Sequence, residues 1–258
     1  MLILNYISFF FLIILTFLSI SGYGAVFSNH KNINIFEKLF LGFIFLAFFN
    51  TLFHFFFKLN FYINLLIFLL GIIFFKINKL NIDKKKLFYF LIIIFLIPIF
   101  ITQKYHEDFG YYHLPYALSF LEEKIIFGLA NSNIAYTYNS IWLNVYPTFF
   151  TETKNYDFLT LPTFILFICF ILLLTHNFLN SKDWRLSNLF SIVLIFYYLL
   201  KFTRISEFGV DLPSSLYSNL AIFYFIKFFE TQDLDNKKNY FFLNTNFAVF
   251  SILIKLSA

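Results

Sequence analysis

The side chains of this chain that could do chemistry gather in residues 104–157, where apolar sequence gives way to acids, histidines, tyrosines and asparagines. Glu107 and Asp108 come just after the apolar segment Leu87–Thr102. Such a carboxylate pair can act as a general base, orient a nucleophile or share a divalent cation such as Mg²⁺ or Mn²⁺. The pair can equally be solvated or capping acids, because both residue types favour helix starts.

Two histidines lie on either side of this acid pair. His113 is a candidate catalytic residue, and the alternative is a hydrogen-bonded histidine at a membrane interface. His106 and His113 do not have the i, i+4 spacing that places two zinc ligands on one helix face. The sequence therefore does not favour zinc.

A second polar segment, residues 201–214, contains Arg204, Glu207 and Asp211. In one interpretation Arg204 simply pairs with Glu207, and Asp211 caps the next helix. In the other, this segment meets the first one, so that an acid from each flanks a metal ion or an acceptor hydroxyl. Arg204 would then take a phosphate through its planar donor fork.

The composition is that of a membrane protein. Of 258 residues, 60% are apolar and only 13% are charged, whereas soluble domains carry about a quarter charged residues. The basic pI of about 9.1 is explained by lysines in cytoplasmic loops, so we expect membrane lipid and no nucleic acid as a partner. The single cysteine, Cys169, excludes an intrachain disulfide.

Eight apolar segments are candidates for helices that cross about 30 Å of hydrocarbon. They lack the alternation typical of membrane strands, so the predicted fold is an all-α polytopic membrane protein. The segments are Leu2–Ser21, Leu39–Phe57, Phe61–Phe75, Leu87–Thr102, Phe158–Phe178, Leu189–Leu200, Ser215–Phe229 and Tyr240–Leu256. No internal repeat or linker interrupts them, so we predict one domain over residues 1–258.

The lysines predict the orientation. Five of them cluster between the third and fourth segments, which places that loop in the cytoplasm. Alternation along the chain then puts residues 104–157 and 201–214 on the external side of what we expect to be a bacterial inner membrane.

The external segment 104–157 should contain two amphipathic helices that lie on the membrane surface. Pro115–Glu123 carries leucines at helical spacing after a proline suited to a first turn. The second helix is expected at about Asn139–Tyr146, after a turn that contains Gly128. Tyr112 and Trp142 are most simply residues of the interfacial aromatic belt.

These features resemble the type C glycosyltransferases, membrane enzymes that move a sugar from a polyprenyl-phosphate carrier to an acceptor outside the cytoplasm. The runs 107–115, 124–131, 139–142 and 206–213 are more closely similar to an uncharacterised bacterial family of multi-spanning, glycosyltransferase-like proteins. The resemblance implies a core at residues 87–258, preceded by three accessory spans in residues 1–86. The class is usually longer, so we expect the chain to be a fragment of a cell-envelope glycan enzyme.

The resemblance also implies residue roles. The catalytic acid would be Asp108, or Glu107 if the register shifts by one, and His113 is a further candidate. Glu207 or Asp211 would join it, and Asp108 with Glu207 would hold any divalent cation. Candidate substrate-binding residues are Arg204, Lys124, Tyr112, Asn131, Asn139 and Trp142.

Two other classes remain open. A transporter or flippase would place polar groups near the bilayer midplane on broken helices, whereas the polar residues here gather at one face. A non-catalytic membrane scaffold would use them only as interface anchors.

Overall fold

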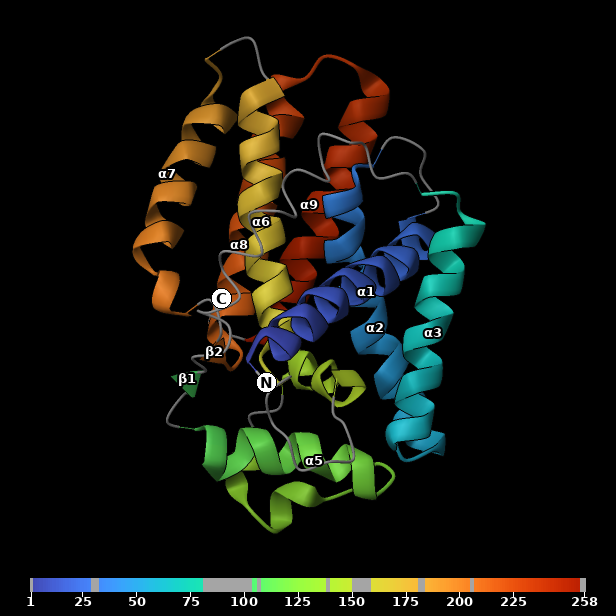
Figure 1. Ribbon diagram of the computed structural model, residues 1–258. Coiled ribbons are helices and arrows are strands. Elements are labelled where there is room, and N and C mark those ends of the chain that lie inside the picture. Colours follow the sequence, from blue (N-terminus) through green and yellow to red (C-terminus); the bar gives the residue numbers. More distant parts are fainter. Residues whose placement is uncertain are drawn as a thin grey trace.

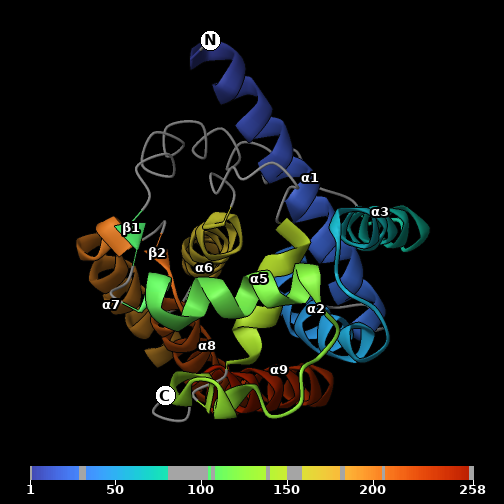
Figure 2. The same cartoon turned by 90° about the horizontal axis from the view of Figure 1, so that it is seen from below.

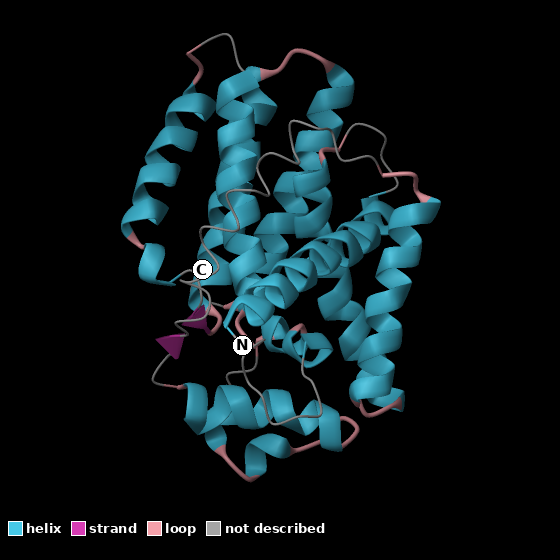
Figure 3. Ribbon diagram, viewed as in Figure 1, coloured by secondary structure: helices cyan, strands magenta, loops and turns pink. Residues whose placement is uncertain are grey.

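The computed structural model describes residues 2–28, 33–80, 104–105, 108–137, 140–149, 159–180, 184–204 and 207–255. Its helices are α1 (Leu2–Ser28), α2 (Ile35–Phe56), α3 (Phe61–Ile77), α5 (Leu114–Glu122), α6 (Leu161–Asn180), α7 (Leu186–Leu200), α8 (Asp211–Glu230) and α9 (Leu234–Ile254). Two short strands, β1 (Lys104–Tyr105) and β2 (Glu207–Phe208), lie together at one end of the helix bundle (Figures 1 and 3). The predicted all-α class is confirmed.

Seven of the eight predicted apolar segments coincide with helices, and the segment at 87–102 lies outside the described residues. In the part of the chain that the structure describes, three helices are long and apolar enough to cross a membrane: Phe9–Ser28, Ile35–Phe56 and Leu161–Asn180. Helices α3 and α7 are apolar but shorter. The fold is therefore that of a helical membrane protein.

Glycines let α1 pack directly on the backbones of α2 and α3. A Cβ atom on Gly24 would lie 1.6 Å from the carbonyl oxygen of Lys38, and one on Gly22 would lie 2.0 Å from that of Gly71. Gly42 of α2 approaches the Ile20 carbonyl oxygen equally closely. Only a residue without Cβ fits such contacts, so these glycines fix how the first three helices cross.

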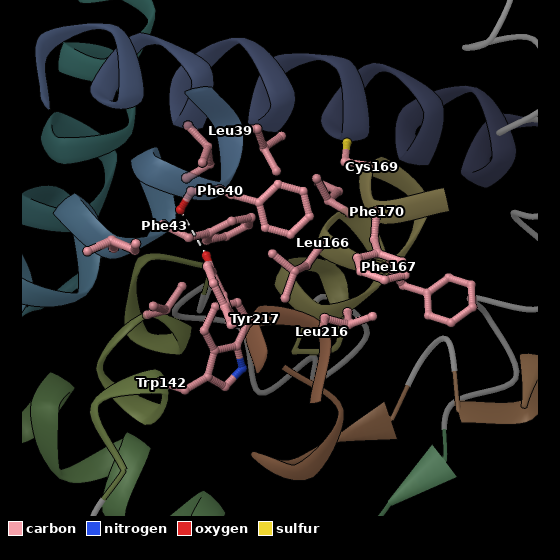
Figure 4. Packing of buried hydrophobic residues seen from close by; sticks show 14 of the residues in the cluster. Leu39, Phe40, Phe43, Trp142, Leu166, Phe167, Cys169, Phe170, Leu216 and Tyr217 are labelled. Carbon is pink, nitrogen blue, oxygen red and sulfur yellow. Dashed lines mark hydrogen bonds between the residues drawn. The ribbon is translucent and has the colours of Figure 1, made fainter. Parts of the chain in front are cut away.

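Helix α2 lies at the centre of the core. Its side chains Leu39, Phe40 and Phe43 face α6, α8 and the segment that carries Trp142 (Figure 4). The Tyr217 hydroxyl of α8 donates to the Phe40 carbonyl oxygen at 2.8 Å, which ties α8 to α2 through a buried hydrogen bond. The first three helices are thus an integral part of the bundle.

The end of the bundle opposite the strands carries a polar network. Asn34 caps α2, and Glu37 completes the capping box by accepting from the Asn34 backbone N–H at 2.6 Å. Glu37 also accepts from the Tyr224 hydroxyl at 2.5 Å, and Lys227 of α8 donates to Asn177 of α6 at 2.5 Å. Polar side chains thus join α2, α6 and α8 where these helices begin or end.

Helix α5 confirms the first of the two helices predicted within residues 104–157, to within one residue at each end. It follows a π-helical turn, Phe109–His113, and carries Pro115 in its first turn. Figure 2 shows α5 lying across the end of the bundle. Gly128 adopts a left-handed conformation with φ 78° in the turn that follows, as a predicted turn glycine can.

The second predicted surface helix is wrong. Residues 141–149 form two 3₁₀ turns, Ile141–Asn144 and Tyr146–Phe149, and Pro147 lies within the second. Their side chains are buried against α2 and α6, and Trp142 and Tyr146 are completely inaccessible. Trp142 is therefore a core residue, because its indole N–H finds an acceptor inside the protein, the Tyr146 hydroxyl at 3.0 Å.

Candidate functional site

The two polar segments found in the sequence meet through a parallel pair of strands. Lys104 is the register partner of Glu207, and Tyr105 is the partner of Phe208. The Phe208 ring lies 5.0 Å from the ring of Phe109, which directly follows Asp108. The predicted meeting of the two segments is therefore seen in the backbone, and Asp108 lies within a few residues of this contact.

Arg204 and Glu207 form the ion pair that the sequence predicted. The Arg204 Nε atom donates to Glu207 Oε2, and Nη2 donates to Oε1 at 3.0 Å. The Glu207 side chain is 7% exposed, so the guanidinium fork supplies hydrogen bonds that water cannot reach to provide. The hydrogen bonds to Glu207 raise the pKa of Arg204, and burial partly opposes them. The guanidinium therefore keeps its charge.

Asp211 connects this pair to a second cation. Its carboxylate accepts from Lys255 Nζ at 2.7 Å and lies 3.7 Å from Arg204 Nη2. Asp211 begins α8 and Lys255 directly follows α9, so the pairing depends on the α8–α9 hairpin. Lys255 is 44% exposed and Arg204 28%, and the two cations thus flank one accessible carboxylate.

Tyr146 connects the buried 3₁₀ segment at residues 141–149 to β2 and to α6. Its buried hydroxyl donates to the Gly209 carbonyl oxygen at 3.0 Å, accepts from Trp142 and lies 3.0 Å from Thr163 Oγ1 of α6. Its ring stacks on that of Phe208 at 4.1 Å. Burial raises the pKa of Tyr146 to about 12, so the phenol stays neutral. We call the contacts of Tyr146 with Trp142, Thr163, Phe208 and Gly209 the Tyr146 joint.

Two other candidate residues of the first polar segment, Asp108 and His113, lie around the same joint. Asp108 is half-buried at the start of the π-helical turn, and His113 at the end of that turn is buried. The His113 ring lies 4.3 Å from the ring of Tyr112 and 6.4 Å from that of Phe208. Glu107 and Asn139 lie outside the described residues.

Lys124 and Asn131 lie apart from the ion pairs. Both are exposed, and they follow α5 at the end that is bound to α2, where the Ile125 N–H donates to the His54 carbonyl oxygen at 3.2 Å. Arg204 pairs with Glu207 of β2, and β2 pairs with β1, which lies beside the other end of α5 (Figure 1). The structure therefore separates Lys124 from Arg204.

Helix α2 carries positioning residues that the sequence analysis missed. Asn50 Nδ2 donates to the Asn144 carbonyl oxygen at 2.7 Å and to Thr148 Oγ1 at 2.8 Å. Asn144 returns a bond to Thr51 at 2.6 Å. Asn50 is fully buried at the end of the apolar run Leu39–Phe49, and an amide directly after that run was the signal available in the sequence.

The described residues offer no ready-made metal centre. Both oxygens of the Glu207 carboxylate accept from Arg204. Within the described ranges no group of three His, Cys, Asp or Glu side chains could hold an ion. A divalent cation bound by Asp108 and Glu207 therefore stays a prediction.

An all-helical bundle with three helices long and apolar enough to cross a membrane defines a class of protein, the helical membrane proteins. Residues 2–258 match the family model described as Domain of unknown function (DUF8201), and the chain belongs to that family. No curated protein and no solved structure matches the chain.

Proposed function

We propose that the chain is a glycosyltransferase-like membrane enzyme that moves a sugar from a polyprenyl-phosphate carrier to an acceptor on the non-cytoplasmic side. In this proposal eight helices span the bacterial inner membrane, and residues 104–157 and 201–214 face outward. The observation that carries the proposal is the pairing of Lys104–Tyr105 with Glu207–Phe208. It brings an acid-bearing turn and a set of cations together at one end of an apolar helix bundle.

The cations match the chemistry of the carrier. A phosphate that approaches from the membrane would replace the Asp211 carboxylate on Lys255 and use the accessible side of Arg204. Glu207 would stay with Arg204 and hold its fork in place. Lys255 thus takes the role that the sequence analysis gave to Lys124.

The transfer itself needs little covalent help from the protein. The acceptor hydroxyl attacks the anomeric carbon, and its proton passes to the Asp108 carboxylate. The bond between that carbon and the phosphate oxygen breaks, and polyprenyl phosphate leaves with the electron pair. Positioning and stabilisation of charge on the leaving phosphate are then the main contributions.

Native mass spectrometry of protein extracted gently from its own membrane tests this proposal. We expect a co-purifying polyprenyl phosphate on the wild type and on Lys124→Ala, and at least a tenfold loss of it in Lys255→Ala. The double variant Arg204→Ala/Glu207→Gln should also lose the carrier without leaving a buried carboxylate unpaired.

The outcomes separate the alternative functions. If only bulk phospholipid accompanies all variants, the carrier site is wrong. If the carrier binds to the wild type and is lost from the variants as expected, but neither the wild type nor Asp108→Asn transfers sugar, a transporter of a lipid-linked solute or a scaffold becomes the better explanation.

A further inference from the structure

The turn after α5 carries large apolar side chains that point away from the protein. Phe127 is 82% exposed and Ile126 44%. They are flanked by the exposed residue Lys124. Such side chains are costly in water when they cluster, and clusters of this kind mark an interaction surface.

This turn is continuous with an exposed strip on α2. Phe48, Leu52, Phe55 and Phe56 are each between 44% and 67% exposed. Their spacing of three and four residues places them on one face of the helix. Since α2 is long and apolar enough to cross a membrane, we expect lipid to cover this α2 strip.

The Phe127 ring extends the α2 strip beyond the end of the helix. It lies 6.2 Å from the ring of Phe55. Backbone hydrogen bonds hold it there: Ile125 N–H donates to the His54 carbonyl oxygen at 3.2 Å, and Leu59 N–H donates to the Phe120 carbonyl oxygen at 2.7 Å. The position of the turn relative to α2 is therefore fixed.

Two lysines mark the level of the headgroups. Lys58 follows α2 closely and Lys124 closely precedes the apolar turn, and both are exposed. Lysines beside aromatic residues are typical of the membrane–water boundary, where the ammonium reaches phosphates while the stem stays in apolar surroundings.

From this continuity we propose that Ile126 and Phe127 insert into the headgroup–acyl boundary of the bilayer beside the end of α2. The occupant of the surface is lipid, and Lys58 and Lys124 bind its phosphates. The insertion fixes the depth of α5, because α5 ends at this turn. It is independent of the proposed sugar chemistry.

Tryptophan fluorescence in liposomes tests the insertion. The exposed Trp184 is replaced (Trp184→Phe), and Trp142 is kept because it is completely buried. Into this background Phe127→Trp introduces a reporter at a position with room for the larger ring. Ser132→Trp, in the polar run 131–133 of the same loop, is the matched control.

We expect lipids brominated near the headgroup to quench Phe127→Trp at least twofold more than Ser132→Trp, and aqueous iodide to show the reverse order. Iodide quenching of Phe127→Trp equal to that of the control would place the turn in water and overturn the proposal. Shielding of Phe127→Trp from both quenchers would show that protein, a second copy or a partner, covers the turn, and would overturn it equally.

Discussion

The Tyr146 hydroxyl and the Gly209 carbonyl oxygen lie 3.0 Å apart in the protein interior. This contact, together with the stacking of the Tyr146 ring on Phe208, joins the buried 3₁₀ segment of the long loop to the short strand that pairs with Lys104–Tyr105. The same hydroxyl also contacts Trp142 and Thr163. The proposed site therefore rests on a joint that is made of neutral, buried groups.

Removal of the Tyr146 hydroxyl should loosen this joint. Tyr146→Phe leaves the Trp142 indole N–H and the Gly209 carbonyl oxygen without their buried partner, which costs about 1–3 kcal/mol. We expect a lower melting temperature in detergent and faster proteolysis near residues 204–209. Tyr111→Phe is the control, because Tyr111 is 62% exposed, and an equal effect of the two changes would contradict the role of the joint.

The raised pKa of Tyr146 also predicts that the stability of the protein falls at alkaline pH. The pKa of Tyr146 is about 10 in the unfolded chain and about 12 in the folded protein. A raised folded pKa stabilises the protein below about pH 10, and this contribution is lost as the pH rises toward about 12. Melting curves between about pH 8 and pH 11.5 should show a decrease above about pH 10 that is smaller in Tyr146→Phe. The difference between the two proteins should be constant below about pH 9.

Much of the architecture was predictable from continuous apolar runs. Such runs specify helices whatever they pack against, and seven of them coincide with helices of the structure. The ion pair of Arg204 with Glu207 was also predictable, because two opposite charges three residues apart in a tight turn can reach each other.

The remainder depended on tertiary contacts. Trp142 looks like a belt residue in sequence, and only the position of the Tyr146 hydroxyl shows that its N–H is satisfied in the core. The pairing of Lys255 with Asp211 requires the α8–α9 hairpin, and no local sequence pattern predicts this pairing. The role of α2 as the central helix depends in the same way on Asn50 finding partners far along the chain.

Asn50 should therefore contribute more to the stability of the fold than its position beside an apolar run of α2 implies. Asn50→Ala removes both donated hydrogen bonds and leaves the Asn144 carbonyl oxygen buried without a donor, at a cost of about 1–3 kcal/mol. We expect a clear fall in melting temperature together with easier proteolysis within 140–149. Asn78→Ala is the matched change, since the exposed Asn78 side chain donates to the Phe74 carbonyl oxygen four residues earlier, and it should leave both measurements unchanged.

The close glycine contacts predict that alanine substitutions at two different glycines will differ in their effect on stability. Gly24→Ala would place a methyl group 1.6 Å from the Lys38 carbonyl oxygen, a backbone atom that cannot move away without separating α1 from α2. We expect destabilisation of about 1–3 kcal/mol or more, seen as a lower melting temperature and a smaller folded yield. Among the described residues, no atom lies within 4 Å of a Cβ atom on Gly110, and the stability of Gly110→Ala should match that of the wild type. Equal stability of Gly24→Ala would show that the crossing of α1 and α2 is wrong.

The last prediction concerns the acid that the proposed reaction requires. Asp108→Asn keeps the size of the side chain but removes its ability to accept the hydroxyl proton, and loss of a general base lowers turnover by about 10²–10⁴-fold. We expect this loss in transfer of radiolabelled sugar from polyprenyl phosphate to membrane acceptors, with the melting temperature and the bound carrier unchanged. Glu122→Gln, at an exposed acid of α5, should retain full turnover. A scaffold would be indifferent to both substitutions, whereas an equal fall in activity in both variants would indicate a general effect of charge at this end of the bundle.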